Sequence, residues 1–213
     1  WKAAPGCMGR VQSFLHSSCS FLIKDMIKYL WLEDGRAAVG SLSPSICGRR
    51  NGGAGMKVIV CSDSHGAFAA AEQLLEQQPK AAAVIFLGDG AEEWGDLHEI
   101  YPEIPFYPVR GNCDWGSDWP GERIVELGGH RIFCTHGHLY GVKTAGTALL
   151  EKRAAEENCD IVLYGHTHVP RIDYIAERYY LNPGSLRQPA EGHPGYIELN
   201  LDGKNTVPIR VEI

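Results

Sequence analysis

The chain has 213 residues, of which 44 % are hydrophobic and 22 % are charged, and these proportions are typical of a globular protein. They exclude an intrinsically disordered chain and a collagen-like repeat. The formal net charge of −6 argues against broad electrostatic attraction to nucleic acid or to an anionic membrane surface.

The cysteines and the apolar runs indicate the compartment. The 7 cysteines are odd in number and contain no C-x-x-C pair, which suits a reducing compartment better than a disulfide framework. No apolar run approaches the ~20 residues that a membrane-spanning helix needs. We therefore expect a cytoplasmic location and no membrane partner.

Residues 1–55 differ from the rest of the chain. They hold seven Lys and Arg against three Asp and Glu, and the apolar spacing over residues 21–32 predicts an amphipathic helix. Because the chain begins at Trp1 and an Asn-Gly-Gly run precedes Met56, we interpret 1–55 as a basic N-terminal extension that is either untranslated or disordered. The alternative is a genuine basic appendage, and in both cases the main domain spans 56–213.

From residue 56 onward, strands and helices alternate. Short β-branched runs predict strands and amphipathic spacing predicts helices. In chain order we expect a strand at 57–61, a helix at 67–78, a strand at 83–87, a helix at 94–101, a strand at 106–110, a hairpin of 124–127 with 131–135, a helix at 144–158 and a strand at 161–164.

The last third is punctuated by Gly, Pro and Asn-Pro turns, which predict short strands in an antiparallel sheet. These strands are expected at 172–175, 179–181, 196–201 and 208–213. A βαβ half followed by a β-rich half predicts an α/β fold, a four-layer α/β/β/α sandwich of two mixed β-sheets.

Polar side chains follow most of the predicted strands of the α/β half, where α/β sheets place their sites. Asp63 and His65 are two residues apart, so in extended backbone both project to one side and can hold one metal ion. The same spacing recurs further along the chain. The complete set, in chain order, is Asp63, His65, Asp89, Asn112, His136, His166 and His168.

The ligand types indicate the metal. Imidazole mixed with carboxylate and amide oxygen, without thiolate, favours Mn²⁺, Fe²⁺, Ni²⁺ or Zn²⁺ over a soft sulfur site and disfavours Mg²⁺ alone. We expect two divalent ions, with Mn²⁺ favoured.

In the order D-x-H, G-D, G-N, T-H-G-H and G-H-T-H, these residues resemble the calcineurin-like metallophosphoesterase superfamily, particularly its small YfcE-like phosphodiesterases. The resemblance covers residues 56 to about 201. It implies that Asp89 bridges two ions and that a metal-bridging hydroxide attacks phosphorus directly, without a phosphoenzyme. It further implies the following sets: Asp63, His65 and His168 for the first ion, and Asn112, His136 and His166 for the second.

One departure from the family pattern affects the catalytic set, which otherwise comprises Asp89, Asn112 and His136. Larger members read G-N-H-[DE], where the His helps to protonate the leaving oxygen, whereas this chain has Cys113 after Asn112. Cys113 and His138 are the two candidates for the general acid. We therefore expect selectivity for good leaving groups.

Weaker signals concern the substrate. Arg187, in a Pro-Gly turn that resembles a family turn, is a candidate to bind the substrate phosphate bidentately, and the alternative is a solvated arginine. Trp94, Trp115 and Trp119 either wall a substrate cleft or an oligomer surface, or serve ordinary packing, and packing is the favoured interpretation.

The leading interpretation is a phosphodiesterase acting on a small soluble diester. Nucleic acid is not expected as a partner, and homo-oligomerisation is left open. Within the enzyme class, a phosphomonoesterase or a nuclease is the alternative. From a different class, the alternative is a protein-binding scaffold like the retromer subunit that shares this fold, but loss of catalysis should have eroded the ligands, and here all seven are present.

Overall fold

The computed structural model describes residues 55–203 and 205–213, in which two five-stranded sheets are flanked by helices. The predicted helix over 21–32 lies outside these residues. The strands are β1 (Met56–Cys61), β2 (Ala83–Phe86), β3 (Phe106–Pro108), β4 (Glu122–Leu127), β5 (His130–Thr135), β6 (Ile161–Tyr164), β7 (Arg171–Ile175), β8 (Arg178–Asn182), β9 (Gly195–Asp202) and β10 (Asn205–Glu212). The helices are α1 (Phe68–Gln77), α2 (Ala91–Ile100), the 3₁₀ helix η1 (His138–Tyr140), α3 (Val142–Ala145) and α4 (Ala148–Glu156).

Both sheets are mixed. The first has the order β10-β9-β1-β2-β3, in which β1, β2 and β3 run parallel and β9 is antiparallel to β1. The second has the order β4-β5-β6-β8-β7, in which β5, β6 and β8 run parallel between two antiparallel edge strands. The parallel strands of each sheet end at one edge, where polar loops follow them.

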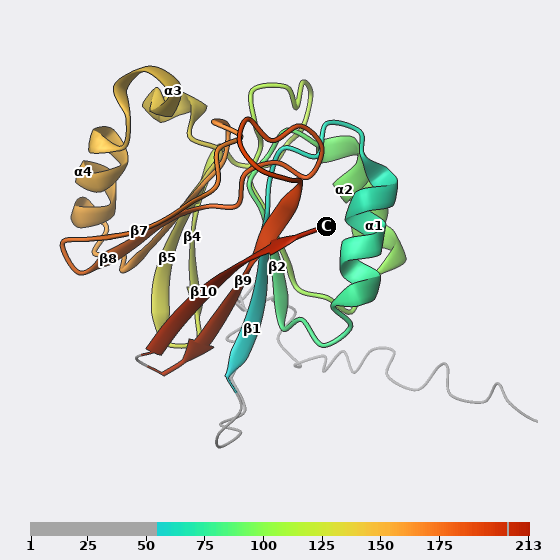
Figure 1. The fold of residues 1–213 in the computed structure, drawn as a ribbon, viewed down its shortest axis with the longest axis horizontal. Coiled ribbons are helices and arrows are strands. Elements are labelled where there is room, and N and C mark those ends of the chain that lie inside the picture. The colour runs from blue at the N-terminus through green and yellow to red at the C-terminus, as the bar shows by residue number, and fades with distance from the viewer. Residues whose placement is uncertain (1–54, 204) are drawn as a thin grey trace, which may run out of the picture. The chain divides into compact units, whose positions relative to one another are not determined.

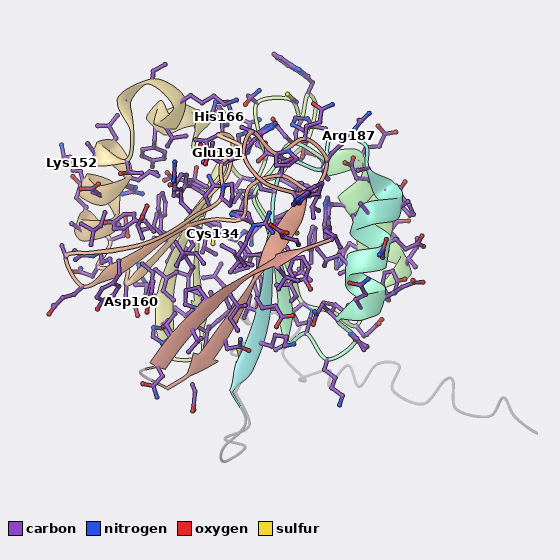
Figure 2. The ribbon with its side chains drawn as sticks, in the orientation of Figure 1. Cys134, Lys152, Asp160, His166, Arg187 and Glu191 are labelled. Atoms are coloured by element: carbon purple, nitrogen blue, oxygen red, sulfur yellow. The ribbon has the colours of Figure 1, made fainter. Side chains whose placement is uncertain are left out.

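Three apolar layers hold the sheets and helices together. One lies between the two sheets, one between the first sheet and α1 with α2, and one between the second sheet and α3 with α4. In Figure 1 the helices accordingly lie on the outer side of each sheet. Figure 2 shows Cys134 in the interior between the sheets. The predicted four-layer α/β/β/α sandwich is confirmed.

The strands of the last third pair antiparallel within β7–β8 and within β9–β10, but the expectation that they form a sheet of their own is wrong. The strands β7 and β8 extend the second sheet, whereas β9 and β10 extend the first. The reason is that β1 and β6 are apolar and central, so each needs a hydrogen-bonded neighbour on both edges. The chain supplies these neighbours from its end: β9 pairs with β1, and β8 pairs with β6.

Several predicted boundaries also change, and the last strand begins at Asn205 rather than at 208. The helix expected over 144–158 is two helices, because Gly146 adopts a left-handed conformation with φ of 68° between α3 and α4. The second helix begins at Ala91 rather than at 94. The third strand ends at Pro108 rather than at 110, and the backbone N–H of Arg110 donates to the carbonyl of Pro120 outside the sheet. None of the helices within the described residues is long and apolar enough to cross a membrane.

Candidate metal centre

The seven predicted ligands converge beyond the carboxyl ends of β1, β2, β3, β5 and β6. The loops that carry them have unusual backbone: five of the seven ligand residues have positive φ, a region that non-glycine residues seldom occupy. The five are Asp63, His65, Asp89, His166 and His168. Figure 2 shows His166 and Arg187 at this end of the sheets and Asp160 at the other.

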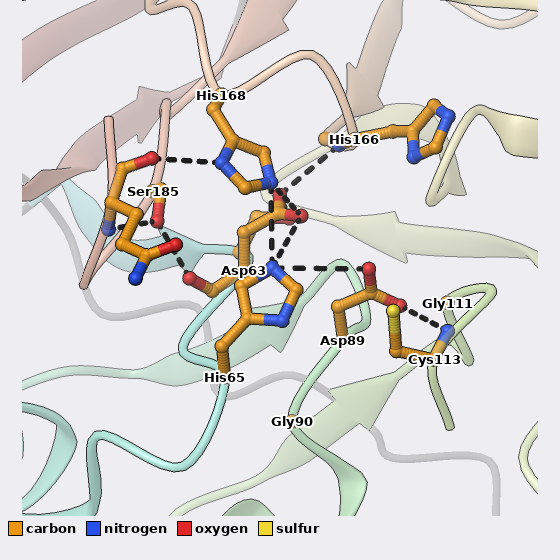
Figure 3. Close-up of polar contacts among 12 residues, drawn as sticks. Asp63, His65, Asp89, Gly90, Gly111, Cys113, His166, His168 and Ser185 are labelled. Carbon is orange, nitrogen blue, oxygen red and sulfur yellow. Dashed lines mark hydrogen bonds and ion pairs between the residues drawn. The ribbon is translucent and has the colours of Figure 1, made fainter. Parts of the chain in front are cut away.

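Asp63, His65 and His168 form the first cluster. Asp63 Oδ1 lies 3.1 Å from His168 Nε2 and 3.7 Å from His65 Nε2, and the two Nε2 atoms are 3.4 Å apart. Figure 3 shows both rings turned toward the Asp63 carboxylate. One small space thus receives a carboxylate oxygen and two ring nitrogens.

The second cluster surrounds the ring of His136, whose side chain is fully buried. His136 Nε2 lies 3.2 Å from Asn112 Oδ1, 3.1 Å from His166 Nδ1 and 3.4 Å from Asp89 Oδ2. The same Oδ2 atom lies 3.9 Å from His65 Nε2 of the first cluster. Asp89 therefore joins the two clusters.

Hydrogen bonds from outside the clusters decide which imidazole nitrogens face inward with a lone pair. The Nδ1 of His136 is 2.7 Å from the carbonyl of Leu87, and the Nδ1 of His168 is 2.8 Å from the carbonyl of Gln188. A carbonyl only accepts, so each Nδ1 carries the hydrogen and each Nε2 is left with its lone pair.

In both Asp63 and Asp89, one carboxylate oxygen accepts hydrogen bonds from the surrounding loops, and the other oxygen is directed into the clusters. Asp63 Oδ2 accepts from the Ser62 hydroxyl (2.5 Å) and from the backbone N–H of His166 (3.0 Å), and Asp89 Oδ1 accepts from the N–H of Cys113 (2.7 Å). Asp63 Oδ1 is buried without a hydrogen-bond partner. Because an unpaired buried carboxylate oxygen among lone pairs is strongly unfavourable, the residues fit a bound cation.

The pKa shifts follow from this crowding. Burial lowers the pKa of His136, but the Asp89 and Asp63 carboxylates more than offset it, and the net pKa is raised. The Asp63 carboxylate, 3.1 Å from its Nε2, raises the pKa of His168. Burial, together with the charge of His136, lowers the pKa of His166 to about 4. Burial opposes ionisation of Asp89, yet His136 and the Cys113 N–H bring its pKa well below the usual range.

Asp114 organises the loops under the second cluster, a role that the sequence pattern did not indicate. Its Oδ2 accepts from the backbone N–H groups of Asp89 (2.8 Å) and Gly111 (2.6 Å). Its Oδ1 accepts from those of Gly90 (2.7 Å) and Ala91 (2.8 Å). One buried carboxylate therefore caps α2, which explains the early start of that helix, and ties two ligand loops together.

Two glycines are required by the close approach of these loops. A Cβ on Gly111 would lie 2.0 Å from Asp89 Oδ1, and one on Gly88 would lie 2.4 Å from the backbone N of Gly111. The Gly-Asp and Gly-Asn pairs therefore allow Asp89 and Asn112 to face one another.

The remaining predicted residues lie around the clusters. Cys113 is exposed beside Asp89, and partial desolvation together with the Asp89 carboxylate raises the pKa of its thiol to about 11. The ring of His138 lies 5.3 Å from that of His136, and burial lowers its pKa. Arg187 donates through Nη1 to the carbonyl of His65, at the rim of the first cluster.

The three tryptophans separate into two kinds. Trp94 is buried and stacks on Phe86 and Phe106, and Trp119 meets the same two rings edge-on, so both serve packing. Trp115 is 91 % exposed. It lines a cleft of ≈ 510 Å³ that also contains His65, Asp89 and Cys113.

Comparisons with known proteins agree with this geometry. The family model of the calcineurin-like phosphoesterase superfamily domain matches residues 56–204. The chain is 32 % identical over 165 residues to phosphodiesterase YfcE of Escherichia coli K12, covering 65 % of this chain and 84 % of that protein. It is also 32 % identical over 137 residues to the probable metallophosphoesterase YsnB of Bacillus subtilis, covering 63 % and 77 %.

Solved structures show the same fold. A predicted phosphoesterase from Streptococcus pneumoniae TIGR4 superposes with a TM-score of 0.63 at 30 % identity, covering 73 % of this chain and 88 % of that one. Vacuolar protein sorting 29 of Cryptosporidium parvum superposes with a TM-score of 0.60 at 20 % identity, covering 76 % and 100 %. The second likeness concerns the fold alone.

Proposed function

Because the chain belongs to the calcineurin-like phosphoesterase superfamily, we propose that it is a two-metal phosphodiesterase that hydrolyses a small soluble diester. The observation that carries the proposal is the pair of Asp/His clusters that share the Asp89 carboxylate. In this proposal the first ion is held by Asp63, His65, His168 and Asp89. The second is held by Asp89, Asn112, His136 and His166.

Two bound divalent ions supply an activated water nucleophile and neutralise charge on the phosphate. The protein's part is to hold the ligands in place before substrate arrives. Carbonyl acceptors orient His136 and His168, and Ser62 and the Cys113 N–H orient the two carboxylates. Arg187, fixed at the rim through the His65 carbonyl, supplies a positive charge for the substrate phosphate.

Protonation of the leaving oxygen is the weak step of this site. A thiol with a pKa of about 11 remains protonated at neutral pH but gives up its proton poorly, and His138, with its lowered pKa, is largely neutral there. Both residues are retained as candidate donors. Their poor match to neutral pH supports selectivity for esters with good leaving groups.

Mn²⁺ is the proposed native ion. The ligand atoms are imidazole nitrogen, carboxylate oxygen and one amide oxygen, a set that suits Mn²⁺ and also admits Fe²⁺, Ni²⁺ or Zn²⁺. We also propose a reducing, cytoplasmic location, which the four unpaired cysteines of the described residues support: Cys61, Cys113, Cys134 and Cys159.

A metal-reconstituted hydrolysis screen tests the function. The protein is loaded with each divalent ion and assayed on diesters and monoesters beside Asp89→Ala and His136→Ala. Matched controls are Asp173→Ala and His193→Ala, which alter exposed residues that belong to neither cluster. We expect diester hydrolysis that only the first pair of variants abolishes. Protein that binds two ions and hydrolyses no diester would refute the proposal, and faster hydrolysis of monoesters would favour a phosphomonoesterase.

A further inference from the structure

The cleft beside the first cluster extends away from the ligands to the loop that carries Trp115. We propose that this cleft binds the organic substituent of the phosphoester, an inference that rests on the proposed function. The substituent is an uncharged planar ring that stacks on Trp115. The substrate is thereby a single-phosphate ester with an aromatic or heteroaromatic group.

The exposure of Trp115 is the first observation. An indole carries a large apolar surface, and Trp94 buries its indole against Phe86 and Phe106, whereas Trp119 packs partly on the same rings and also lines the cleft. Trp115 instead remains 91 % exposed in the wall of a cleft that contains His65 and Asp89. An exposed aromatic side chain beside a reactive centre is suited to stacking on a ligand ring.

The backbone under Trp115 is anchored, which is the second observation. Trp115 follows Asp114, whose carboxylate accepts four backbone N–H groups from the ligand loops. The Trp115 N–H itself donates to the carbonyl of Cys113 (3.0 Å). The indole therefore starts from backbone tied to the metal centre, which reduces the conformational entropy lost when a ring binds.

The charge of the cleft is the third observation. Among the described residues, no lysine or arginine lines it, whereas several carboxylates do. Asp114 is saturated by backbone donors, and Glu93 accepts from the Ser64 hydroxyl (2.7 Å) and the N–H of Gly66 (2.6 Å). Glu92 is exposed in the lining. A second phosphate or a carboxylate on the substituent would be repelled, so an uncharged ring is favoured.

Calorimetric binding of two non-hydrolysable compounds to the Mn²⁺-loaded full chain tests the proposal. Phenylphosphonate and methylphosphonate present the same dianion and differ in the ring. We expect phenylphosphonate to bind about tenfold more tightly, as stacking on an aromatic side chain predicts. In Trp115→Ala the preference should disappear while methylphosphonate affinity is unchanged. Tyr174→Ala, which removes an exposed aromatic side chain on β7, should keep the preference.

The outcomes separate this inference from the proposed function. Equal affinity of the two compounds in the wild type, or a preference that survives Trp115→Ala, would overturn the ring assignment. An equal loss of affinity for both compounds in Trp115→Ala would also overturn the ring assignment, because Trp115 would then support the metal centre itself. A carboxyl group on the phenyl ring should weaken binding, and less so in Glu92→Gln; tighter binding would contradict an uncharged ring. If neither compound binds and no ester is hydrolysed, the proposed function fails.

Discussion

Replacing Asp114 by Asn should strongly destabilise the protein, although the substitution only exchanges one carboxylate oxygen for an NH₂ group. Each carboxylate oxygen of Asp114 accepts two backbone N–H groups. An Asn amide has one oxygen, so in either orientation its NH₂ group faces two N–H donors. Two hydrogen bonds to a charged acceptor are lost, and each is worth about 1.5–3 kcal/mol.

The expected decrease in the free energy of unfolding is therefore about 3–6 kcal/mol, a large part of the total of about 5–15 kcal/mol for a folded domain. The assay is urea unfolding of the metal-free protein for Asp114→Asn, Asp114→Ala and the control Asp118→Asn, which alters an exposed carboxylate on the same loop. Weaker Mn²⁺ binding should accompany the loss, because Asp89 lies on one of the released loops.

A free energy of unfolding within about 0.5 kcal/mol of the wild-type value for Asp114→Asn would refute the reasoning, since that is the range of an ordinary surface substitution. An equally small change in the free energy of unfolding for Asp114→Ala would show that water replaces the carboxylate without loss of stability.

Three further outcomes are expected. Asp63→Asn should raise the free energy of unfolding of metal-free protein by about 1 kcal/mol, because an amide donor replaces the unpaired buried Oδ1, and should abolish the Mn²⁺-induced rise in Tm; an undiminished rise in a thermal melt would contradict the ligand role. The pKa of His166 is lowered from 6.5 to about 4, so its contribution to stability is present above pH 6.5 and is lost as the pH falls toward 4. Between pH 6.5 and pH 4, the urea midpoint of metal-free His166→Gln should fall less than that of the metal-free wild type. Equal decreases in the two proteins would count against a lowered pKa of His166. Cys113→His should increase kcat on alkyl diesters more than on p-nitrophenyl diesters, because imidazole donates a proton better at neutral pH than a thiol with a pKa of about 11; an unchanged dependence of kcat on leaving-group pKa would exclude Cys113 from proton donation.

The strands and the ligand order were predictable from the sequence because both depend on local patterns. The strands β1, β2 and β6 are mostly apolar runs with buried residues on both faces, and each is followed within three residues by a predicted ligand. The seven predicted ligands follow the ends of β1, β2, β3, β5 and β6 in the order that the resemblance required, and the structure brings all seven together.

The course of the last third was not predictable in the same way. Periodicity indicates that β7 to β10 are strands, but it carries no information about which sheet each one joins. That choice depends on the unpaired edges of β1 and β6, which are distant in sequence. The break at Gly146 is likewise a local left-handed turn within a segment whose apolar spacing suits one continuous helix.

The chemistry of the site is a property of the sequence, since the ligand types and their two-residue spacings indicate a mixed imidazole and carboxylate metal centre. Its organisation belongs to the tertiary structure. The four donors to Asp114, the carbonyls that orient His136 and His168, and the exposure of Trp115 beside Asp89 all involve groups from separate loops. Such contacts form only when the sheets pack, because hydrogen bonds and burial depend on distances in space rather than on order along the chain.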